Sequence, residues 1–404
     1  MPESAAPSPR NEHESVSTPR DGAELDRLGR VLSHVFRFPP ERVEPFIKIV
    51  GDDNFLVVRE GAEVAGGLCL VPMGQWFGGR RVSMAGVAAV GVAPHQRAKG
   101  VATRLMRGCV REMHARGFAL SALYPATQPL YRRVGYEQAG SRYVISMRTA
   151  DIDTRDRALD LRPIEDSDFS SVETLYRRYA KRHNGLLDRG EYIWRRVYEP
   201  KPGKALGYLI EREGEPEGYL YSAQADSEKR AYDLWLSDFV ALTPDAARRG
   251  LTFMADHRSM TDRAKWAGSP LDPAILLLTE KALEVKLADH WMLRVVDVAK
   301  ALEERGYAPG VACEFEFEVF GDPVLPEVND GGYRVRVADG RAEVERIATP
   351  AGPRIHLNGL AALYTGHLSG QALRATGLLE ADFGEAATLS TAFAGSPPFM
   401  PDAF

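Results

Sequence analysis

The chain has 404 residues, of which 44% are hydrophobic and 26% are charged. This composition is ordinary for a soluble protein of two or three domains, and it excludes a chain that is disordered throughout and a bundle of membrane helices. The 51 lysines and arginines against 56 acidic residues leave a net charge of −5. A broad surface for polyanions is therefore not expected, and nucleic acid is not a predicted partner.

The first 20 residues are rich in proline, serine and charge and contain no apolar stretch. This pattern predicts a disordered leader over residues 1–20 and argues against a signal peptide. No run of about 18 apolar residues occurs later, so neither a spanning helix nor a membrane partner is expected. The three cysteines are widely spaced and form no metal-ligand pattern. The sequence thus predicts a cytoplasmic protein with reduced thiols and no metal site.

The segment after the leader alternates helical and strand patterns. Apolar spacing predicts a helix over residues 23–34 and a second helix that begins after Gly100 and ends at Gly117. Apolar runs between turns predict strands over residues 54–60, 63–72, 81–84, 86–92, 119–123 and 136–147. We expect these elements to form one α+β unit over residues 21–150.

One pattern of this unit recurs 150 residues later. Residues 90–94 followed by Gly100 are matched by residues 240–244 followed by Gly250, and both copies predict a strand, a turn at proline and a helix. The second copy has Ala247 in place of Arg97 and Thr252 in place of Ala102. We interpret residues 151–290 as a duplicated unit that has lost part of its ligand loop; chance similarity is the alternative.

The character of the chain changes after residue 290. Helical patterns occur over residues 297–306, 359–365 and 370–376, and strand patterns over residues 312–320, 333–337 and 342–347. The last two strands flank Asp339-Gly340, a dipeptide typical of a hairpin turn. A third α+β domain over residues 291–404 is the simplest interpretation.

The strongest chemical signal lies between the strand at residues 86–92 and the helix after it. Arg97-x-x-Gly100-x-Ala102 combines the free amides of a helix start with the cationic side chains Arg97, Lys99 and Arg104. This combination suits a pyrophosphate. The spacing matches neither the dinucleotide fingerprint nor a Walker loop, and an ordinary basic helix start is the alternative.

The strand that leads into this loop carries a second signal. Val90 and Val92 share one face of the strand, whereas Val87 is out of phase with them, which indicates a bulge near Ala88 and Ala89. A bulge would splay the strand from its neighbour and leave an open edge. Small residues along that edge would let an extended amide chain such as pantetheine lie against it. Coenzyme A carries both a pyrophosphate and such an arm.

These residues resemble known motifs. Residues 90–103 resemble motif A of the GNAT acyltransferases, and residues 130–136 resemble their motif B. From about residue 20 to Phe404 the chain resembles the Eis (enhanced intracellular survival) family of N-acetyltransferases. The resemblance implies two GNAT domains, the second degenerate, and a sterol-carrier-like C-terminal domain. It also implies acetyl-CoA as co-substrate, a small-molecule amine such as an aminoglycoside, a polyamine or a lysine-type amine as acceptor, and a homo-hexamer.

The resemblance also assigns roles to residues. It places acetyl-CoA on Val90, Gly91, Val92, Arg97, Ala98, Lys99, Gly100, Val101, Ala102 and Thr103, with Ala126 and Thr127 beside them. It makes Tyr131 the general acid, because a phenol stays protonated at neutral pH. It makes the α-carboxylate of Phe404 the general base, and apolar neighbours would strengthen that base. The alternatives are a packing tyrosine and a frayed chain end.

The acceptor site is less defined by the sequence. Candidates for an aromatic and acidic pocket are Phe36, Phe38, Trp76, Phe77, Glu41, Glu44 and Asp402, with ordinary core packing as the alternative. We expect direct attack by the amine in a ternary complex, because Cys109 lies on an apolar helix face and is poorly placed for a covalent route. Two rival functions remain at this point: a longer-chain acyl-CoA N-acyltransferase, and a non-catalytic protein that binds CoA or lipid.

Overall fold

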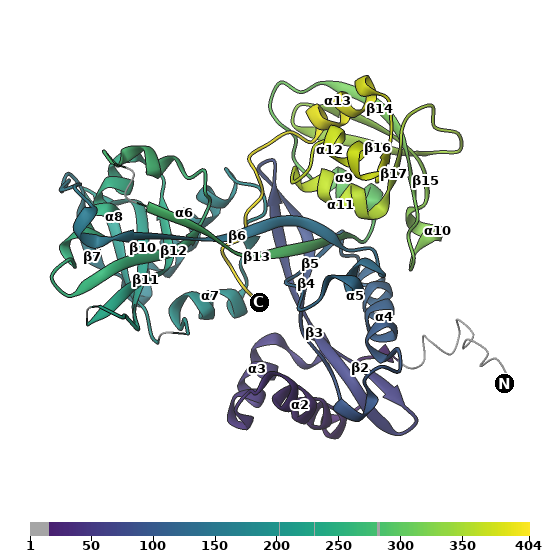
Figure 1. Cartoon of the computed structure of the whole chain (residues 1–404), viewed down its shortest axis with the longest axis horizontal. Coiled ribbons are helices and arrows are strands. Elements are labelled where there is room, and N and C mark those ends of the chain that lie inside the picture. Colours follow the sequence, from purple (N-terminus) through teal and green to yellow (C-terminus); the bar gives the residue numbers. More distant parts are fainter. Residues whose placement is uncertain (1–15, 202, 230, 281–282) are drawn as a thin grey trace.

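One 13-stranded sheet runs through the first two thirds of the chain, in a computed structural model that describes residues 16–201, 203–229, 231–280 and 283–404. Its strand order is β1-β2-β3-β4-β5-β13-β6-β12-β11-β10-β9-β7, and β8 pairs with β3. Most strands of a first unit (residues 16–148) lie toward one end of this order and most strands of a second unit (residues 160–295) toward the other, but β13 of the second unit lies between β5 and β6 of the first. A third domain (residues 298–392) packs on the first unit, and the C-terminal tail (residues 393–404) returns to the junction of the two units (Figure 1).

The first unit is a meander of strands followed by a helix and two crossing strands. Its elements are β1 (Val16–Ser17), α2 (Gly22–Phe36), α3 (Val43–Val50), β2 (Phe55–Glu60), β3 (Glu63–Phe77), β4 (Arg80–Val92), α4 (Val101–Ala115), β5 (Leu120–Leu123), α5 (Gln128–Arg132) and β6 (Glu137–Arg148). Local chemistry sets several of these boundaries. Asp21 caps α2 by accepting a hydrogen bond from the Glu24 amide, and Gly61 and Gly117 follow β2 and α4 with positive φ angles of 59° and 75°.

The two faces of this sheet carry different apolar clusters. Val82, Met84 and Ala88 of β4 pack on the side covered by α2, which we call the α2 face. Ala85 and Val87 pack on the opposite side under α4, the α4 face. This division follows from the alternation of side chains along a strand.

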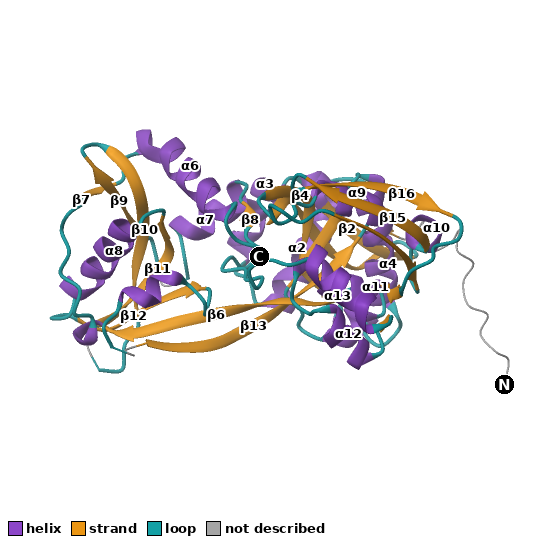
Figure 2. Ribbon diagram, turned by 90° about the horizontal axis from the view of Figure 1, so that it is seen from above, coloured by secondary structure: helices purple, strands orange, loops and turns teal. Residues whose placement is uncertain are grey.

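The second unit shares its strands with the first. Its elements are β7 (Asp160–Pro163), α6 (Phe169–Ala180), β8 (Leu187–Asp188), α7 (Glu191–Tyr198), β9 (Leu206–Arg212), β10 (Glu215–Ala225), β11 (Tyr232–Ala241), α8 (Pro244–Asp256), β12 (Thr261–Gly268) and β13 (Leu283–Val295). Strand β13 pairs with β5 and β6, and β6 also pairs with β12. The long strands β6 and β13 therefore tie the two lobes together (Figure 2).

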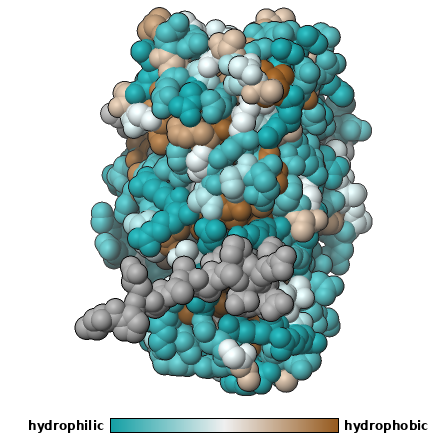
Figure 3. Space-filling model, turned by 90° about the vertical axis from the view of Figure 1, so that its right-hand side faces the viewer, coloured by the Kyte–Doolittle hydropathy of each residue, from teal (hydrophilic) through white to brown (hydrophobic). Residues whose placement is uncertain are grey.

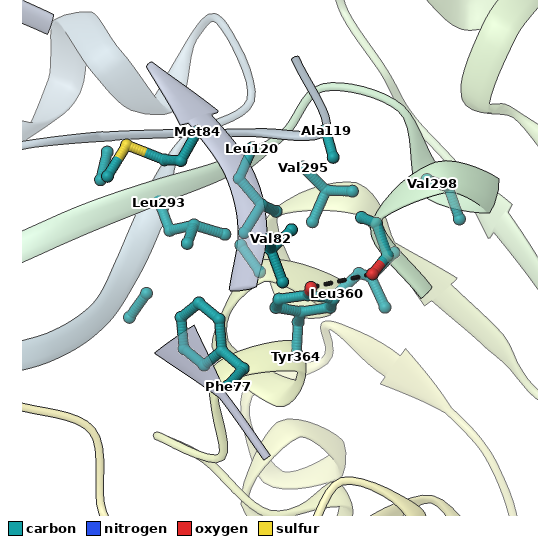
Figure 4. Close-up of a cluster of buried hydrophobic side chains, with 14 of the residues drawn as sticks. Phe77, Val82, Met84, Ala119, Leu120, Leu293, Val295, Val298, Leu360 and Tyr364 are labelled. Atoms are coloured by element: carbon teal, nitrogen blue, oxygen red, sulfur yellow. Dashed lines mark hydrogen bonds between the residues drawn. The ribbon is translucent and has the colours of Figure 1, made fainter. Parts of the chain in front are cut away.

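The third domain has its own five-stranded sheet, with the order β16-β15-β14-β17-β18. Its elements are α9 (Val298–Glu304), β14 (Cys313–Phe320), α10 (Pro326–Asn329), β15 (Gly331–Ala338), β16 (Arg341–Ile347), β17 (Arg354–His356), α11 (Leu357–Thr365), α12 (Gly370–Thr376), β18 (Leu379–Glu380) and α13 (Phe383–Ala392). Helix α11 packs against β6 and β13 of the large sheet. Figure 4 shows Phe77 and Val82 beside Leu360 and Tyr364, so both bodies contribute to one core.

The structure changes two of the sequence predictions. The strands expected at residues 81–84 and 86–92 are one strand, β4. The prediction of a disordered leader over residues 1–20 is wrong near its end, because Val16 and Ser17 form a strand that pairs with Val58 and Val57. Residues 1–15 lie outside the described part of the chain. Helices α3 and α5 were not predicted. Both are short, at eight and five residues, and too brief for a clear periodicity.

The surface is ordinary for a polar protein. The face shown in Figure 3 is mostly hydrophilic, with apolar side chains in small separated patches. Within the described ranges, no helix has both the length and the apolar character needed to cross a membrane.

Candidate active site

The predicted bulge and open edge are both present in β4. Gly67 of β3 pairs with Gly91 and Cys69 pairs with Ala88, so two residues of β4 lie opposite the single residue between them. Ala89, one of these two residues, has a positive φ of 52°. On its other side β4 pairs with β5 from Met84 to Gly86, and the pairing ends there. From residue 87 onward, this edge of β4 has no strand partner among the described residues.

The loop after β4 is exposed and poorly capped. Ala98 and Gly100 have φ angles of 61° and 76°, and α4 begins at Val101 without a side-chain cap. The amides of its first turn are therefore open to a ligand. Arg97 and Lys99 are exposed beside them, and Arg97 has no ion pair in the part of the chain that the structure describes. Open amides beside exposed cations are the features on which the prediction of a pyrophosphate site rests.

The second copy of the pattern is built differently. Helix α8 begins at Pro244, and its start is capped by the Thr243 hydroxyl, which accepts from the Ala246 amide at 3.2 Å. The Glu217 carboxylate in turn bonds to that hydroxyl. The helix thus begins where the first copy has its exposed loop, and its N-terminus is occupied by a side chain and a negative charge. An anion has no comparable place to bind there.

Tyr131 and its neighbour Tyr136 differ in how their hydroxyls are used. Tyr136 is fully buried and its hydroxyl bonds to the Ser121 hydroxyl at 2.7 Å. Tyr131 lies on α5 with 6% of its surface exposed, and within the described residues its hydroxyl has no hydrogen-bond partner. Burial raises the pKa of Tyr131 to about 12. A protonated, unengaged phenol is suited to donate a proton. Ala126 and Thr127, just before α5, are exposed.

The C-terminal tail lies in the junction between the units and is held along its backbone. Phe399 forms a parallel bridge with Ser141 of β6. The Tyr124 hydroxyl bonds to the carbonyl oxygens of Met400 and Asp402 at 2.9 and 3.0 Å, and the Arg142 Nε donates to the Pro401 carbonyl at 2.9 Å. The tail is thus fixed up to its last residues and is not frayed.

The final residue is seated on β4. The ring of Phe404 packs on the Tyr124 ring, with centroids 5.9 Å apart. It also covers Gly86 so closely that a Cβ at that position would lie 2.6 Å from the ring. Gly86 is the last residue of β4 that pairs with β5. The chain therefore ends where the open edge begins.

The two predicted catalytic groups lie on opposite faces of the sheet. Tyr131 belongs to the apolar cluster of the α4 face, whereas Phe404 packs against the cluster of the α2 face. Neither Cys69 nor Cys109 is placed to act as a nucleophile. Both thiols are fully buried, and burial raises the pKa of Cys69 to about 12 and that of Cys109 still further.

Several candidates for the acceptor pocket are core residues. Phe77 is fully buried and packs on the Tyr364 ring at 5.4 Å, and Trp76 is 5% exposed. Asp402 is also buried, and its carboxylate is already paired with an arginine. These three residues are therefore not available to a cationic acceptor. Phe36 and Phe38 do remain exposed.

Sequence reasoning missed the residues that hold the tail. Tyr124, Arg142 and the arginine that pairs with Asp402 carry no motif, and each lies more than 200 residues from its partner in the tail. The apolar composition of the tail was the one available signal that it packs against the protein.

Comparisons with known proteins agree with this geometry. Residues 19–139 and 185–295 each match the acetyltransferase (GNAT) domain family, and residues 298–401 match the sterol carrier protein domain family. The structure resembles a GCN5-related N-acetyltransferase from Anabaena variabilis with a TM-score of 0.91 and 36% identity, over 96% of this chain and 99% of that one. The chain belongs to the GCN5-related N-acetyltransferases.

Further similarity specifies which branch of the GCN5-related N-acetyltransferases this is. N-acetyltransferase Eis of Mycobacterium tuberculosis is 29% identical over 387 residues, which cover 89% of this chain and 91% of that protein. Eis1 of Mycobacterium abscessus shares the fold, with a TM-score of 0.78 and 22% identity over 96% of this chain and all of that one. The enzyme is thus an Eis-family GNAT acetyltransferase with two GNAT domains and a sterol-carrier-like domain.

Proposed function

We propose that this enzyme transfers the acetyl group of acetyl-CoA to a small-molecule primary amine by direct attack in a ternary complex. The observation that carries the proposal is the position of the chain end: Phe404 is seated on Gly86, where β4 parts from β5. A carboxylate, an open strand edge and an exposed basic loop then belong to one site. The amine attacks the acetyl carbon, and the amine, not a cysteine, is the nucleophile.

The co-substrate has a fitting place in the first unit. Val90, Gly91 and Val92 lie on the unpaired edge of β4, where an amide arm can add as a strand would. Ala98, Gly100, Val101, Ala102 and Thr103 form the loop and first turn of α4, whose amides suit the diphosphate, and Arg97 and Lys99 supply positive charge. We place Ala126 and Thr127 at the mouth of the same edge. One co-substrate binds per chain, because the second unit has no such loop.

Tyr131 and the Phe404 carboxylate are the proposed acid and base. The base removes a proton from the ammonium form of the acceptor, the free amine attacks the acetyl carbon, and Tyr131 gives its proton to the departing sulfur. The raised pKa of Tyr131, about 12, keeps this donor protonated throughout the neutral range. We further propose, from the family resemblance, a cytoplasmic homo-hexamer that accepts aminoglycosides, polyamines or lysine-type amines.

Steady-state kinetics of single-hydroxyl variants test the proposal. Tyr131→Phe should lower kcat about 100-fold and leave the KM for acetyl-CoA within about twofold, because only the proton donor is lost. Tyr136→Phe is the matched control: its hydroxyl bonds to Ser121 inside the core, so its kcat should stay near that of the wild type. Equal kcat for Tyr131→Phe and the wild type would remove Tyr131 from the reaction. A parallel series of longer acyl-CoA donors tests the preference for acetyl.

A further inference from the structure

A buried ion pair anchors the C-terminal tail two residues before its end. Arg189, the residue after β8, has a side chain that is only 1% exposed. Its Nε and Nη2 atoms donate to the two carboxylate oxygens of Asp402 at 3.0 and 2.8 Å. Such a two-pronged pair fixes the orientation of the carboxylate as well as its distance. Asp402 is thereby held rigidly, with only Ala403 between it and Phe404.

Arg189 is itself fixed on all sides. Its Nη1 and Nη2 atoms also donate to the Asp238 carboxylate, at 2.5 and 3.2 Å, and the Tyr219 hydroxyl donates to the same carboxylate at 2.6 Å. The guanidinium lies over the rings of Tyr176 and Trp194, with its central carbon 3.8 and 4.9 Å from their centroids. Two carboxylates and two aromatic rings thus contact the guanidinium and fix its position.

The ion pair joins parts of the chain that are far apart in sequence. Strand β8, directly before Arg189, pairs with β3 of the first unit. Asp238 lies on β11 of the second unit. Asp402 belongs to the tail that follows the third domain. The arginine therefore fixes the end of the third domain to the second unit, at the edge of the first unit's site.

We propose that Arg189 is the positioning residue for the terminal carboxylate. The arginine acts through Asp402 and does not touch the substrates. By holding Asp402 it keeps Phe404 on Gly86 and the carboxylate beside the open edge of β4. The second unit, which lacks a co-substrate loop, thus contributes to the reaction by holding the base. This inference rests on the proposed function of the Phe404 carboxylate.

Asp402→Asn is the variant that tests the anchor with the least damage. It keeps the shape of the side chain and leaves Arg189 paired with Asp238, whereas removal of Arg189 would leave two buried carboxylates unpaired. Carboxypeptidase A, which removes C-terminal aromatic residues, reports whether the tail is held. We expect Phe404 release, measured by intact mass, to be at least about tenfold faster in Asp402→Asn, because cleavage follows the population of the detached tail.

The same variant should change the reaction in a specific way. We expect kcat at pH 7 to fall about 10- to 100-fold, with the KM for acetyl-CoA within about twofold, because the base is displaced while the loop is untouched. The difference in kcat between Asp402→Asn and the wild type should become smaller toward pH 9.5, because more of the amine is already unprotonated there. A purely structural role would lower kcat equally at all pH values.

Glu24→Gln is the matched control. Glu24 forms a buried pair with Arg59 in the first unit, with side-chain exposures of 7% and 5%, and does not contact the tail. It should leave Phe404 release and the pH profile unchanged. The proposal is overturned if Asp402→Asn releases Phe404 at the wild-type rate, or if release accelerates while kcat and its pH profile stay unchanged.

A chain extended by two glycines past Phe404 separates this proposal from the one on which it rests. If the extended chain keeps full kcat, the terminal carboxylate is not the base, and both proposals fail. If the extension abolishes turnover but Asp402→Asn does not lower it, the carboxylate assignment stands and only the role of Arg189 is lost.

Discussion

The seat of Phe404 on β4 makes the reaction sensitive to a single methyl group. Gly86→Ala would place a Cβ 2.6 Å from the Phe404 ring and 2.5 Å from the Met73 methyl. Because ordinary carbon contacts need about 3.5 Å, the ring must withdraw by about 1 Å. Met73 ends in a flexible methyl and Phe404 is the last residue, so both can move without disturbing the backbone of β4.

The expected effects on stability and on rate are very different. Overpacking in a rigid core costs about 1–3 kcal/mol, and we expect the low end here because both neighbours can give way. Replacement of glycine by alanine recovers about 0.4–1 kcal/mol through the unfolded state. The net change in the free energy of unfolding should therefore be below about 1 kcal/mol. A base displaced by about 1 Å, in contrast, costs about 100-fold in kcat.

Thermal unfolding and steady-state kinetics separate these two effects. Gly86→Ala should unfold within a few degrees of the wild type, keep its KM for acetyl-CoA within about twofold, and lose about 100-fold in kcat. Gly22→Ala is the control, because a Cβ at that exposed position meets nothing within 4 Å. A Gly86→Ala enzyme with wild-type kcat would refute the reasoning that the position of the Phe404 ring sets the rate.

Two other properties can be predicted from the structure. Arg97→Gln removes an exposed cation from the loop, so the KM for acetyl-CoA should rise about fivefold with kcat at saturation unchanged, and the wild-type KM should rise with salt more steeply than that of the variant. Burial between Tyr179 and Phe399 lowers the pKa of His183 to about 4, so the unfolded chain binds a proton below about pH 6.5 that the folded chain does not. His183 should therefore lower the free energy of unfolding by about 2 kcal/mol between pH 7 and pH 5. Chemical denaturation of His183→Gln should show a pH dependence that is smaller by this amount.

The phosphate loop and its strand were predictable because their signals are local. The phase change between Val87 and Val90 indicates the bulge, and the sequence from Arg97 to Gly100 indicates the helix start. Both follow from side-chain alternation and helix geometry within about ten residues. The structure has the bulge at Ala89 and starts α4 at Val101, as these patterns require.

The contacts that hold the end of the chain could not be predicted from such local patterns. The Tyr124 hydroxyl, Arg142 and Arg189 meet the tail across 213 to 278 residues of sequence. No periodicity encodes a contact at that distance, because it depends on how β6 and β13 cross between the units. The aromatic residues at 76 and 77 show the same limit: their composition suits a pocket and a core equally, and only their burial decides for the core.

The central claim is that the last carboxylate of the chain accepts the proton of the acceptor amine. The most direct test is kcat between pH 6 and 9.5 for the enzyme whose Phe404 carboxylate has been converted to a carboxamide, an uncharged group of the same shape. The account predicts a kcat about 100-fold lower at pH 7 and a deficit that shrinks as the pH rises. Equal kcat values for the amide and the carboxylate across this range would contradict it.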